Sequence, residues 1–569
     1  MRALLLFTLL GLSISLAAVP DADERKHKLI DTNTIFFDSD FKNWPGDLTR
    51  TKWEKRRAGL QKQILVAAGL DPLPAKRTAP RAIISAKQSF DGFTVENVLL
   101  ETKPDHWLGG NLFRPVNASG KRPAIVSPHG HWKAGRLEQT ETGNIPARGA
   151  MMARMGMVVF NYDMVGYNDT KQTPHAFGNE LWNWGPLGLQ LWNSIRVVDY
   201  LSSLPDVDAS KIGATGASGG GTQVFLLAAV DDRIRWAAPV NMISGIMQGG
   251  SPCENAPGLR IDTFNVEIAA LIAPRPLLVV AATGDWTKNT PRDEFPAMKK
   301  IYAFYDKAPE VESVQFNAPH NYNQASREAV YDFFARRILG HSAGPKESNV
   351  PRFSESSMLA APSGLPAGAL DAAALLAQHQ AAAKAVPPSR ERLRTALHVE
   401  WPTQVEAMQN GANFVLSRGR DRVAVRRIGG KNAAVIVIDP AGIEAAAKNP
   451  VIVKLASAGN AVYLIEPFRR AVPDKARYYH TFQRSEASNQ AQDLLTVLRW
   501  LENDKPTLLG LGDAAVWVRV AAAMSPAPPK IAGEVSGFTG SDADWQRVFP
   551  APGIQWAGGW DAINRLSKK

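Results

Sequence analysis

One glycine-rich pentapeptide carries the clearest chemical signal in the chain. Gly216-Ala217-Ser218-Gly219-Gly220 fits the pattern G-x-S-x-G, with a strand-like apolar run before it and a helix-like apolar segment after it. A serine on a sharp strand-to-helix turn needs glycines around it and presents its hydroxyl at the end of the sheet. We therefore predict that Ser218 is a nucleophile. The alternative is a glycine-rich turn that contains an incidental serine.

A nucleophilic serine needs a base, and the base needs an acid that orients its ring. After Ser218, the chain offers an acid, Asp285, and then a base, His320. Each of the two closes an apolar run typical of a buried strand. The carboxyl ends of parallel strands are where ligands bind in open α/β sheets. We predict that Ser218 attacks, that His320 takes and returns its proton, and that Asp285 fixes the imidazole tautomer. Three other acids could reach the same edge in place of Asp285: Asp163, Glu254 and Asp293.

An oxyanion formed on the substrate needs two fixed donors. The backbone N–H of Gly219 is one candidate, and the N–H of His131, in the loop His129-Gly130-His131, is the other. The H-x-H spacing of that loop could also indicate a zinc pair. No cluster of further ligand residues accompanies it in the sequence, so we expect no metal and no other cofactor.

Several aromatic residues follow the predicted strand ends. Their flat faces would suit sugar rings or an apolar acyl chain at the mouth of a site, although some could be ordinary core. Glu254, in the polar segment 253–260, is expected to border the same pocket. The aromatic candidates are Trp132, Tyr167, Trp182, Trp184 and Trp286.

The elements that must position these residues are short apolar runs alternating with helical segments, the pattern of a parallel sheet covered by helices. We expect this α/β domain over residues 91–340, after an N-terminal helical segment and lead-in at 19–90. The expected strands lie at 124–130, 157–163, 212–218, 236–241, 276–285 and 311–320.

The rest of the chain predicts a second, smaller α/β domain. Residues 341–370 are rich in Ala, Pro, Ser and Gly, which indicates a linker, and strand-like runs resume within 371–569. In Gly510-Leu511-Gly512-Asp513-Ala514, Gly512 holds the place that the nucleophile has in the first domain. This is either a degenerate copy of the first half or a common strand-to-helix turn, and we expect no catalysis there.

Near the start of the chain, Arg2 is followed by an uncharged apolar run that ends in the small residues Ala17 and Ala18, a pattern typical of a secretory signal over residues 1–18. An uncleaved membrane anchor is the alternative. We expect an exported protein, periplasmic or extracellular, without a membrane span in the mature chain. Its one cysteine, Cys253, cannot form an internal disulfide.

The length and the charge exclude some functions. With 569 residues, of which 45% are hydrophobic and 21% charged, the chain is not a small binding module or a disordered tail. The net charge of +11 is spread along the chain apart from one cluster, residues 50–57. We expect this cluster to be a helix face in solvent rather than a phosphate-binding patch, and no nucleic-acid partner.

Five segments together resemble secreted bacterial α/β hydrolases related to acetyl xylan esterases and cephalosporin C deacetylases. The resemblance covers residues 90–340 and implies an α/β-hydrolase fold with a doubly wound, mostly parallel sheet. It also implies a serine esterase that deacetylates carbohydrates through an acyl-enzyme, with small-molecule or polysaccharide esters as substrates. The segments are PHGHW at 128–132, NYDMVGY at 161–167, GASGGG at 216–221, GDWTKNTP at 284–291 and APHNYN at 318–323.

The resemblance also has departures. In those esterases a tyrosine at the position of His131 lends its N–H to the oxyanion, and the acid precedes a proline as Asp285 does here. Gly219, however, stands where they usually have glutamine, and Thr290 replaces a cysteine. Glucuronoyl esterases carry an arginine after the nucleophile, which Gly219 cannot replace. A glucuronoyl-esterase-like enzyme, a general carboxylesterase, a serine peptidase of the same fold and a non-catalytic carbohydrate-binding protein remain alternatives.

Overall fold

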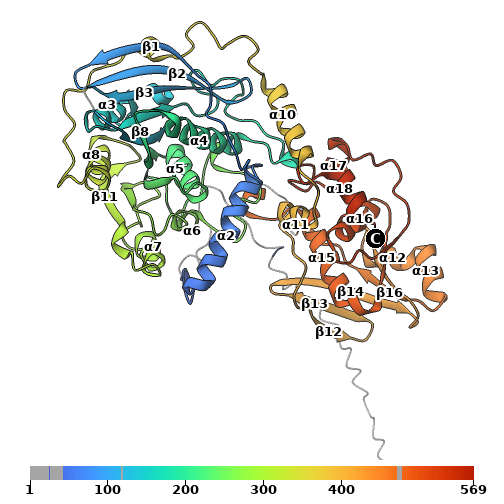
Figure 1. The fold of residues 1–569 in the computed structure, drawn as a ribbon. Coiled ribbons are helices and arrows are strands. Elements are labelled where there is room, and N and C mark those ends of the chain that lie inside the picture. Colours follow the sequence, from blue (N-terminus) through green and yellow to red (C-terminus); the bar gives the residue numbers. More distant parts are fainter. Residues whose placement is uncertain (1–24, 26–42, 117–118, 471–476, 569) are drawn as a thin grey trace, which may run out of the picture.

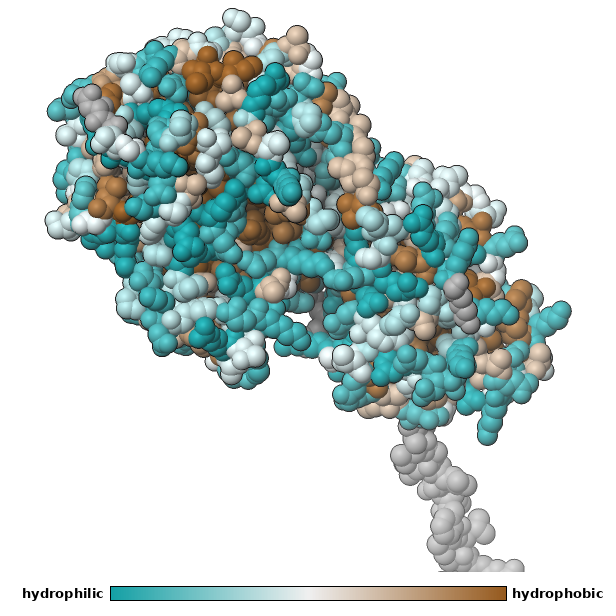
Figure 2. Space-filling model, viewed as in Figure 1, coloured by the Kyte–Doolittle hydropathy of each residue, from teal (hydrophilic) through white to brown (hydrophobic). Residues whose placement is uncertain are grey.

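The computed structural model describes residues 25, 43–116, 119–470 and 477–568, which form two units, each built on its own sheet (Figure 1). The predicted signal segment at 1–18 lies outside these residues. None of the described helices combines the length and the apolar character needed to cross a bilayer. Hydrophilic residues cover most of the face seen in Figure 2, and hydrophobic ones appear there as separate patches.

The first unit is built on a nine-stranded sheet in the order β1-β2-β3-β7-β4-β8-β9-β10-β11. The first three strands and β7 pair antiparallel, and the strands from β7 to β11 are parallel. The strands expected from the apolar runs are therefore confirmed. Their bounds are β1 Ala82–Phe90, β2 Phe93–Lys103, β3 His106–Pro115, β4 Arg122–Pro128, β7 Val158–Tyr162, β8 Val207–Ala217, β9 Ile234–Val240, β10 Leu277–Gly284 and β11 Val311–Pro319.

Helices cover both faces of this sheet, and a separate apolar core fills each interface. One core contains side chains of α2, α4, α5, α6 and α7, and the other contains those of α3 and α8. This is the doubly wound arrangement predicted from the sequence. The helices are α2 Arg50–Ala67, α3 Ile145–Arg154, α4 Pro186–Ser203, α5 Gly219–Val230, α6 Asn265–Ala270, α7 Glu294–Ala303 and α8 Gln324–Phe334, with a π-helical turn over Ala335–Leu339.

The second unit has a seven-stranded sheet in the order β12-β13-β14-β16-β15-β17-β18. Helices α11, α15, α16, α17 and α18 line the core on one face, and α12 and α13 pack on the other. Its strands are β12 Glu406–Asn410, β13 Asn413–Arg418, β14 Asp421–Gly429, β15 Ala434–Ile438, β16 Ala461–Ile465, β17 Thr507–Gly510 and β18 Lys530–Ala532. Its helices are α10 Ala372–Ala385, α11 Arg390–Leu397, α12 Ile443–Lys448, α13 Pro450–Ser457, α14 Tyr479–Phe482, α15 Glu486–Trp500, α16 Ala514–Met524, α17 Asp542–Val548 and α18 Gly559–Leu566.

The two sheets share one topology. The order β1-β2-β3-β7-β4-β8-β9 matches the whole second sheet strand for strand, in chain order and in direction. The first sheet then continues with β10 and β11, which have no counterpart among the described strands of the second. This match favours the interpretation of the second unit as a degenerate copy of the first.

Residues 341–370 connect the units but do not form a loose linker. Helix α9 (Glu355–Met358) and its flanks accept hydrogen bonds from side chains of the antiparallel strands β1, β2 and β3. The carbonyl of Ser357 accepts bonds from Gln88 and Asn97, each at 2.9 Å. Phe353 is buried in the core beneath α3 and α8. This connecting segment is therefore packed on the first unit through buried residues such as Phe353, Met358 and Ala360, although its composition is rich in Ala, Pro, Ser and Gly.

A segment of the first unit, residues 177–184, contacts the second. The carbonyl of Leu181 accepts the N–H groups of Gln555 and Trp556 at 3.0 and 3.1 Å. The carboxylate of Asp542 accepts bonds from Trp182 Nε1 and Asn179 Nδ2, each at 3.0 Å. The side chains of Leu181, Trp182 and Trp184 belong to the core of the second unit.

Replacing Asp542 by alanine should destabilise this contact. The change leaves the buried indole N–H of Trp182 without an acceptor, so we expect the free energy of unfolding to fall by about 2 kcal/mol. Urea unfolding followed by circular dichroism measures the change. Asp504→Ala, at an exposed aspartate of the same unit, is the matched control and should leave stability within about 0.5 kcal/mol. Equal stabilities of the two variants would contradict the assignment.

Candidate active site

Ser218 lies on a strained turn between β8 and α5. Its backbone has φ 57° and ψ −128°, a conformation that residues other than glycine rarely adopt and that is typically held at functional sites. The flanking glycines are required by space. A Cβ on Gly216 would lie 2.7 Å from the carbonyl oxygen of Gly220, and one on Gly220 would lie 2.7 Å from that of His129. The turn thus presents the Ser218 hydroxyl at the carboxyl edge of the sheet.

His320 and Asp285 meet at the ends of the neighbouring strands β11 and β10. His320 Nδ1 lies 2.8 Å from Asp285 Oδ2. The other carboxylate oxygen accepts the backbone N–H of Thr287 at 2.7 Å and its hydroxyl at 2.5 Å. The side chain of Asp285 is 2% exposed and that of His320 is 30% exposed. The aspartate is therefore fixed in place while the imidazole stays open to a substrate.

The three alternative acids are engaged elsewhere. Asp163 forms a buried ion pair with Arg136, Glu254 accepts the N–H groups of Gly250 and Ser251, and Asp293 pairs with Arg292. Among the described residues no hydrogen bond joins the Ser218 hydroxyl to His320. Such contacts often tighten only when substrate is bound. The arrangement can supply a nucleophile, a base and an orienting acid from the ends of β8, β10 and β11.

The loop after β4 passes directly against this turn. His129 is fully buried, and burial lowers its pKa to about 3, so that the ring is neutral. Its Nδ1 donates to the carbonyl of Gly130 at 2.6 Å, and its Nε2 accepts the N–H of Met164 at 2.8 Å. In the described part of the chain neither the N–H of Gly219 nor that of His131 donates to a protein acceptor. Both stay available for an oxyanion.

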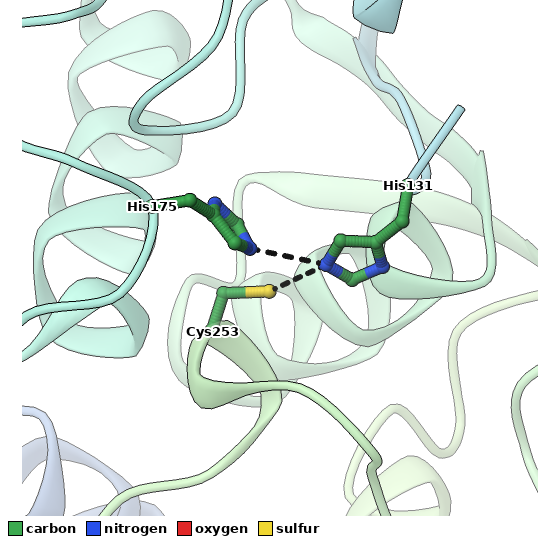
Figure 3. Close-up of side chains that lie close together, drawn as sticks. All are labelled: His131, His175 and Cys253. Atoms are coloured by element: carbon green, nitrogen blue, oxygen red, sulfur yellow. Dashed lines mark hydrogen bonds between the residues drawn. The ribbon is translucent and has the colours of Figure 1, made fainter. Parts of the chain in front are cut away.

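The two histidines of the H-x-H loop do not pair with each other. The ring of His131 contacts residues from other loops instead. His131 Nε2 lies 3.2 Å from His175 Nε2 and 3.1 Å from Cys253 Sγ, as Figure 3 shows. The three ligand-type atoms lie within 4.8 Å of one another. The further ligand residues that the sequence lacks near the H-x-H pair are therefore His175 and Cys253, which come from two distant segments of the chain. Among the residues that the structure describes, this is the group of three that could hold a metal ion.

Three of the five aromatic candidates lie at this edge. The ring of Trp286 lies against His320 in a tilted contact with centroids 4.3 Å apart, and that of Tyr167 contacts His129 and His175. A Cβ on Gly130 would lie 2.7 Å from the ring of Trp132 and 3.0 Å from Ser218 Cβ. The ring of Trp132 and the side chain of Ser218 therefore lie close to each other, on either side of Gly130.

The prediction that Trp182 and Trp184 lie at the mouth of the site is wrong. Trp182 and Trp184 are 4% and 7% exposed and pack into the core of the second unit, because their segment crosses between the units. Glu254 is also buried, which raises its pKa, and it holds its own loop through Gly250 and Ser251 rather than facing the mouth with a free carboxylate.

Comparison with known proteins shows the family to which this chain belongs. Methylesterase BT1017 is 33% identical to the chain and has a TM-score of 0.51, over 59% of this chain and 78% of its own. This chain belongs to the same family of α/β-hydrolase esterases. The fold class and the family resemblance predicted from the sequence are thereby confirmed.

Other matches to this esterase are more distant. YtaP of Bacillus subtilis (strain 168), a protein named as a hydrolase, is 24% identical over 268 residues, which are 43% of this chain and 86% of its own. A glucuronoyl esterase from Solibacter usitatus is 17% identical, with a TM-score of 0.39, over 53% of this chain and 96% of its own. No protein-family model matches the chain.

Residues of the second unit also contact the segment that follows Cys253 and Glu254, which no sequence pattern indicated. The N–H groups of Gly258 and Arg260 donate to the carbonyls of His480 and Thr481 at 2.7 and 2.8 Å. Tyr478, two residues before His480, lines a cavity together with Pro252 and Asn255, the neighbours of Cys253 and Glu254. Only the folded contact between the units brings these residues together.

The departure at Gly219 has a steric explanation in this esterase. A Cβ on Gly219 would lie 2.6 Å from Cε1 of His131, because the imidazole occupies the space beside the residue that follows Ser218. The glutamine or arginine that related esterases place here would displace that ring.

Gly219→Ala should therefore act through His131. We expect kcat/KM on an activated ester to fall about 100-fold, the size of effect that a small displacement of reacting groups produces. In a His131→Gly background, which leaves room for the new methyl group, the same change should have little further effect. A double-mutant cycle measures the coupling. Losses that simply multiply would show that the ring and Gly219 are independent.

Proposed function

We propose that this chain is an exported serine esterase that hydrolyses carboxylic esters of carbohydrates through an acyl-enzyme on Ser218. The observation that carries the proposal is the strained backbone of Ser218, on the same sheet edge as the hydrogen-bonded pair of His320 and Asp285. A non-catalytic binding protein would need neither the strain nor the pair.

In the proposed reaction, Ser218 Oγ attacks the ester carbonyl carbon while His320 Nε2 takes the hydroxyl proton. The N–H groups of Gly219 and His131 stabilise the oxyanion. The bond to the alcohol then breaks, and the alcohol leaves with the proton from His320. Water, deprotonated by the same imidazole, attacks the acyl-enzyme, which releases the acid and restores the serine hydroxyl.

Methyl esters of sugar acids are the substrate class that we favour. The family relative at 33% identity is a methylesterase, and in that reaction methanol is the leaving group. The mouth combines polar imidazoles with the faces of Trp132, Tyr167 and Trp286, which suits a sugar ring bearing hydroxyl groups. Deacetylation of acetylated carbohydrates, the expectation from the sequence resemblance, is the second candidate.

Export is part of the proposal. It is supported by the charged start, apolar run and small-residue exit of residues 1–18. The single cysteine is consistent with an oxidising compartment, because it has no partner for an internal disulfide.

Variants of the proposed triad should separate chemistry from folding. Ser218→Ala should lower kcat by about 10⁶-fold, and Asp285→Asn by about 10⁴-fold, because an asparagine holds the wrong imidazole tautomer. Initial rates of hydrolysis of a p-nitrophenyl ester, with circular dichroism as the folding control, measure both effects. Asp293→Asn is the matched control and should retain activity. Full turnover by folded Ser218→Ala would exclude the nucleophile.

A substrate panel should discriminate the two ester classes. We expect the wild-type protein to release methanol from methyl galacturonate and methyl glucuronate faster than it releases acetate from acetylated xylan. Methanol and acetate are measured directly. The reverse preference would favour the deacetylase, cleavage of bulky glucuronate esters alone would favour a glucuronoyl esterase, and cleavage of peptides alone would contradict the proposal.

A further inference from the structure

Beside the turn that carries Ser218 lies a second cluster of reactive side chains that the proposed hydrolysis does not use. We propose that His131, His175 and Cys253 form a binding site for a divalent transition metal, best suited to Zn²⁺ (Figure 3). The three residues come from the loops after β4, after β7 and after β9, so the fold rather than the sequence assembles the site.

The separations fit a tetrahedral ion. With Zn–N bonds of about 2.0–2.1 Å and a Zn–S bond of about 2.3 Å, ligand atoms around tetrahedral zinc lie about 3.3 to 3.6 Å apart. His131 Nε2 is 3.2 Å from His175 Nε2 and 3.1 Å from Cys253 Sγ. The third pair, His175 and Cys253, has its ligand atoms within 4.8 Å of each other. Side-chain rotations that bring all three separations to the tetrahedral values would complete the geometry.

His175 is already oriented as a ligand. Its Nδ1 lies 2.7 Å from the carbonyl oxygen of Val165, so the proton belongs on Nδ1 and the lone pair of Nε2 points toward the cluster. A carbonyl that fixes the tautomer of a ligating histidine is the usual outer partner in metal sites. This hydrogen bond is a second observation, independent of the distances within the cluster.

Within the cluster, the two contacts of His131 Nε2 compete with each other. Nε2 of His131 faces both the lone pair of His175 and the sulfur of Cys253, and a single N–H can serve only one of these contacts well. A cation among them accepts a lone pair from each nitrogen and from the thiolate, and the thiol proton leaves to solvent on binding.

The donor set selects the kind of ion. Imidazole and thiolate suit zinc, whereas magnesium and calcium prefer oxygen ligands. Three protein ligands leave one coordination position for water or for an oxygen of a bound molecule, as in zinc sites that are not purely structural. The ion would lie beside Gly219, because the ring of His131 covers that residue.

Metal binding can be measured on the full chain without any substrate, so its failure is distinct from failure of the proposed esterase. The metal-free protein is titrated with Zn²⁺ in competition with a chromogenic chelator, and with Co²⁺ followed by absorption. We expect one equivalent of each ion to bind, with a thiolate-to-cobalt charge-transfer band in the near ultraviolet. Mg²⁺ should not compete.

Variants test the ligands one at a time. Cys253→Ser should abolish the charge-transfer band, and both this variant and His175→Gln should weaken zinc binding by about 100-fold or more. His341→Gln, at an exposed histidine outside the cluster, is the matched control and should bind like the wild type. Circular dichroism checks folding.

Two results would overturn the proposal. One is a wild-type protein that binds less than one equivalent of zinc, or whose cobalt complex lacks the thiolate band. The other is unchanged zinc affinity in folded Cys253→Ser and His175→Gln. The wild-type cobalt spectrum decides the matter even where a variant does not fold.

Discussion

The buried guanidinium of Arg136 holds together the loops on which the candidate site is built. It forms ion pairs with Asp163 and Asp169 in the loop after β7, and it donates to Asn111 of β3 and to the carbonyl of Met358. Burial raises the pKa of Asp163 to about 6, although Arg136 opposes the rise. Loss of this cation would leave two carboxylates buried and unpaired, which is among the costliest changes in a protein interior. The positions of Tyr167 and His175 depend on this arrangement, because both lie in the loop that it anchors.

The comparison of the two sheets explains why only one unit has the elements of a catalytic site. Gly512 has φ 53°, close to the value at Ser218, and a Cβ on Gly510 would meet the carbonyl of Ala514 just as one on Gly216 would meet that of Gly220. The turn is thus reproduced with glycine in the nucleophile's place. Strands matching β10 and β11, which lead into Asp285 and His320, are absent from the described second sheet. A serine at position 512 alone would therefore find no partners.

Local sequence patterns were sufficient for the parts of the site that depend on single strand ends. Ser218 was recognisable because its turn needs glycines within two residues, and Asp285 and His320 because each closes an apolar run. Residues whose role depends on long-range packing were not recognisable. Trp182 and Trp184 follow a strand end as rim residues do, yet they are buried by the second unit. His175 and Cys253 have no ligand spacing in the sequence, because the three loops that bring them to His131 converge only in the folded sheet.

The segment 177–184 leaves the first unit and completes the core of the second. As a result, the core of the second unit is incomplete without side chains of the first, although each sheet has its own topology. Chimaeras assembled from relatives at the connection near residue 370 would inherit mismatched aromatic contacts, even if both halves came from stable parents. A productive exchange has to cut the polypeptide in three places and carry this short segment together with the carboxyl-terminal half.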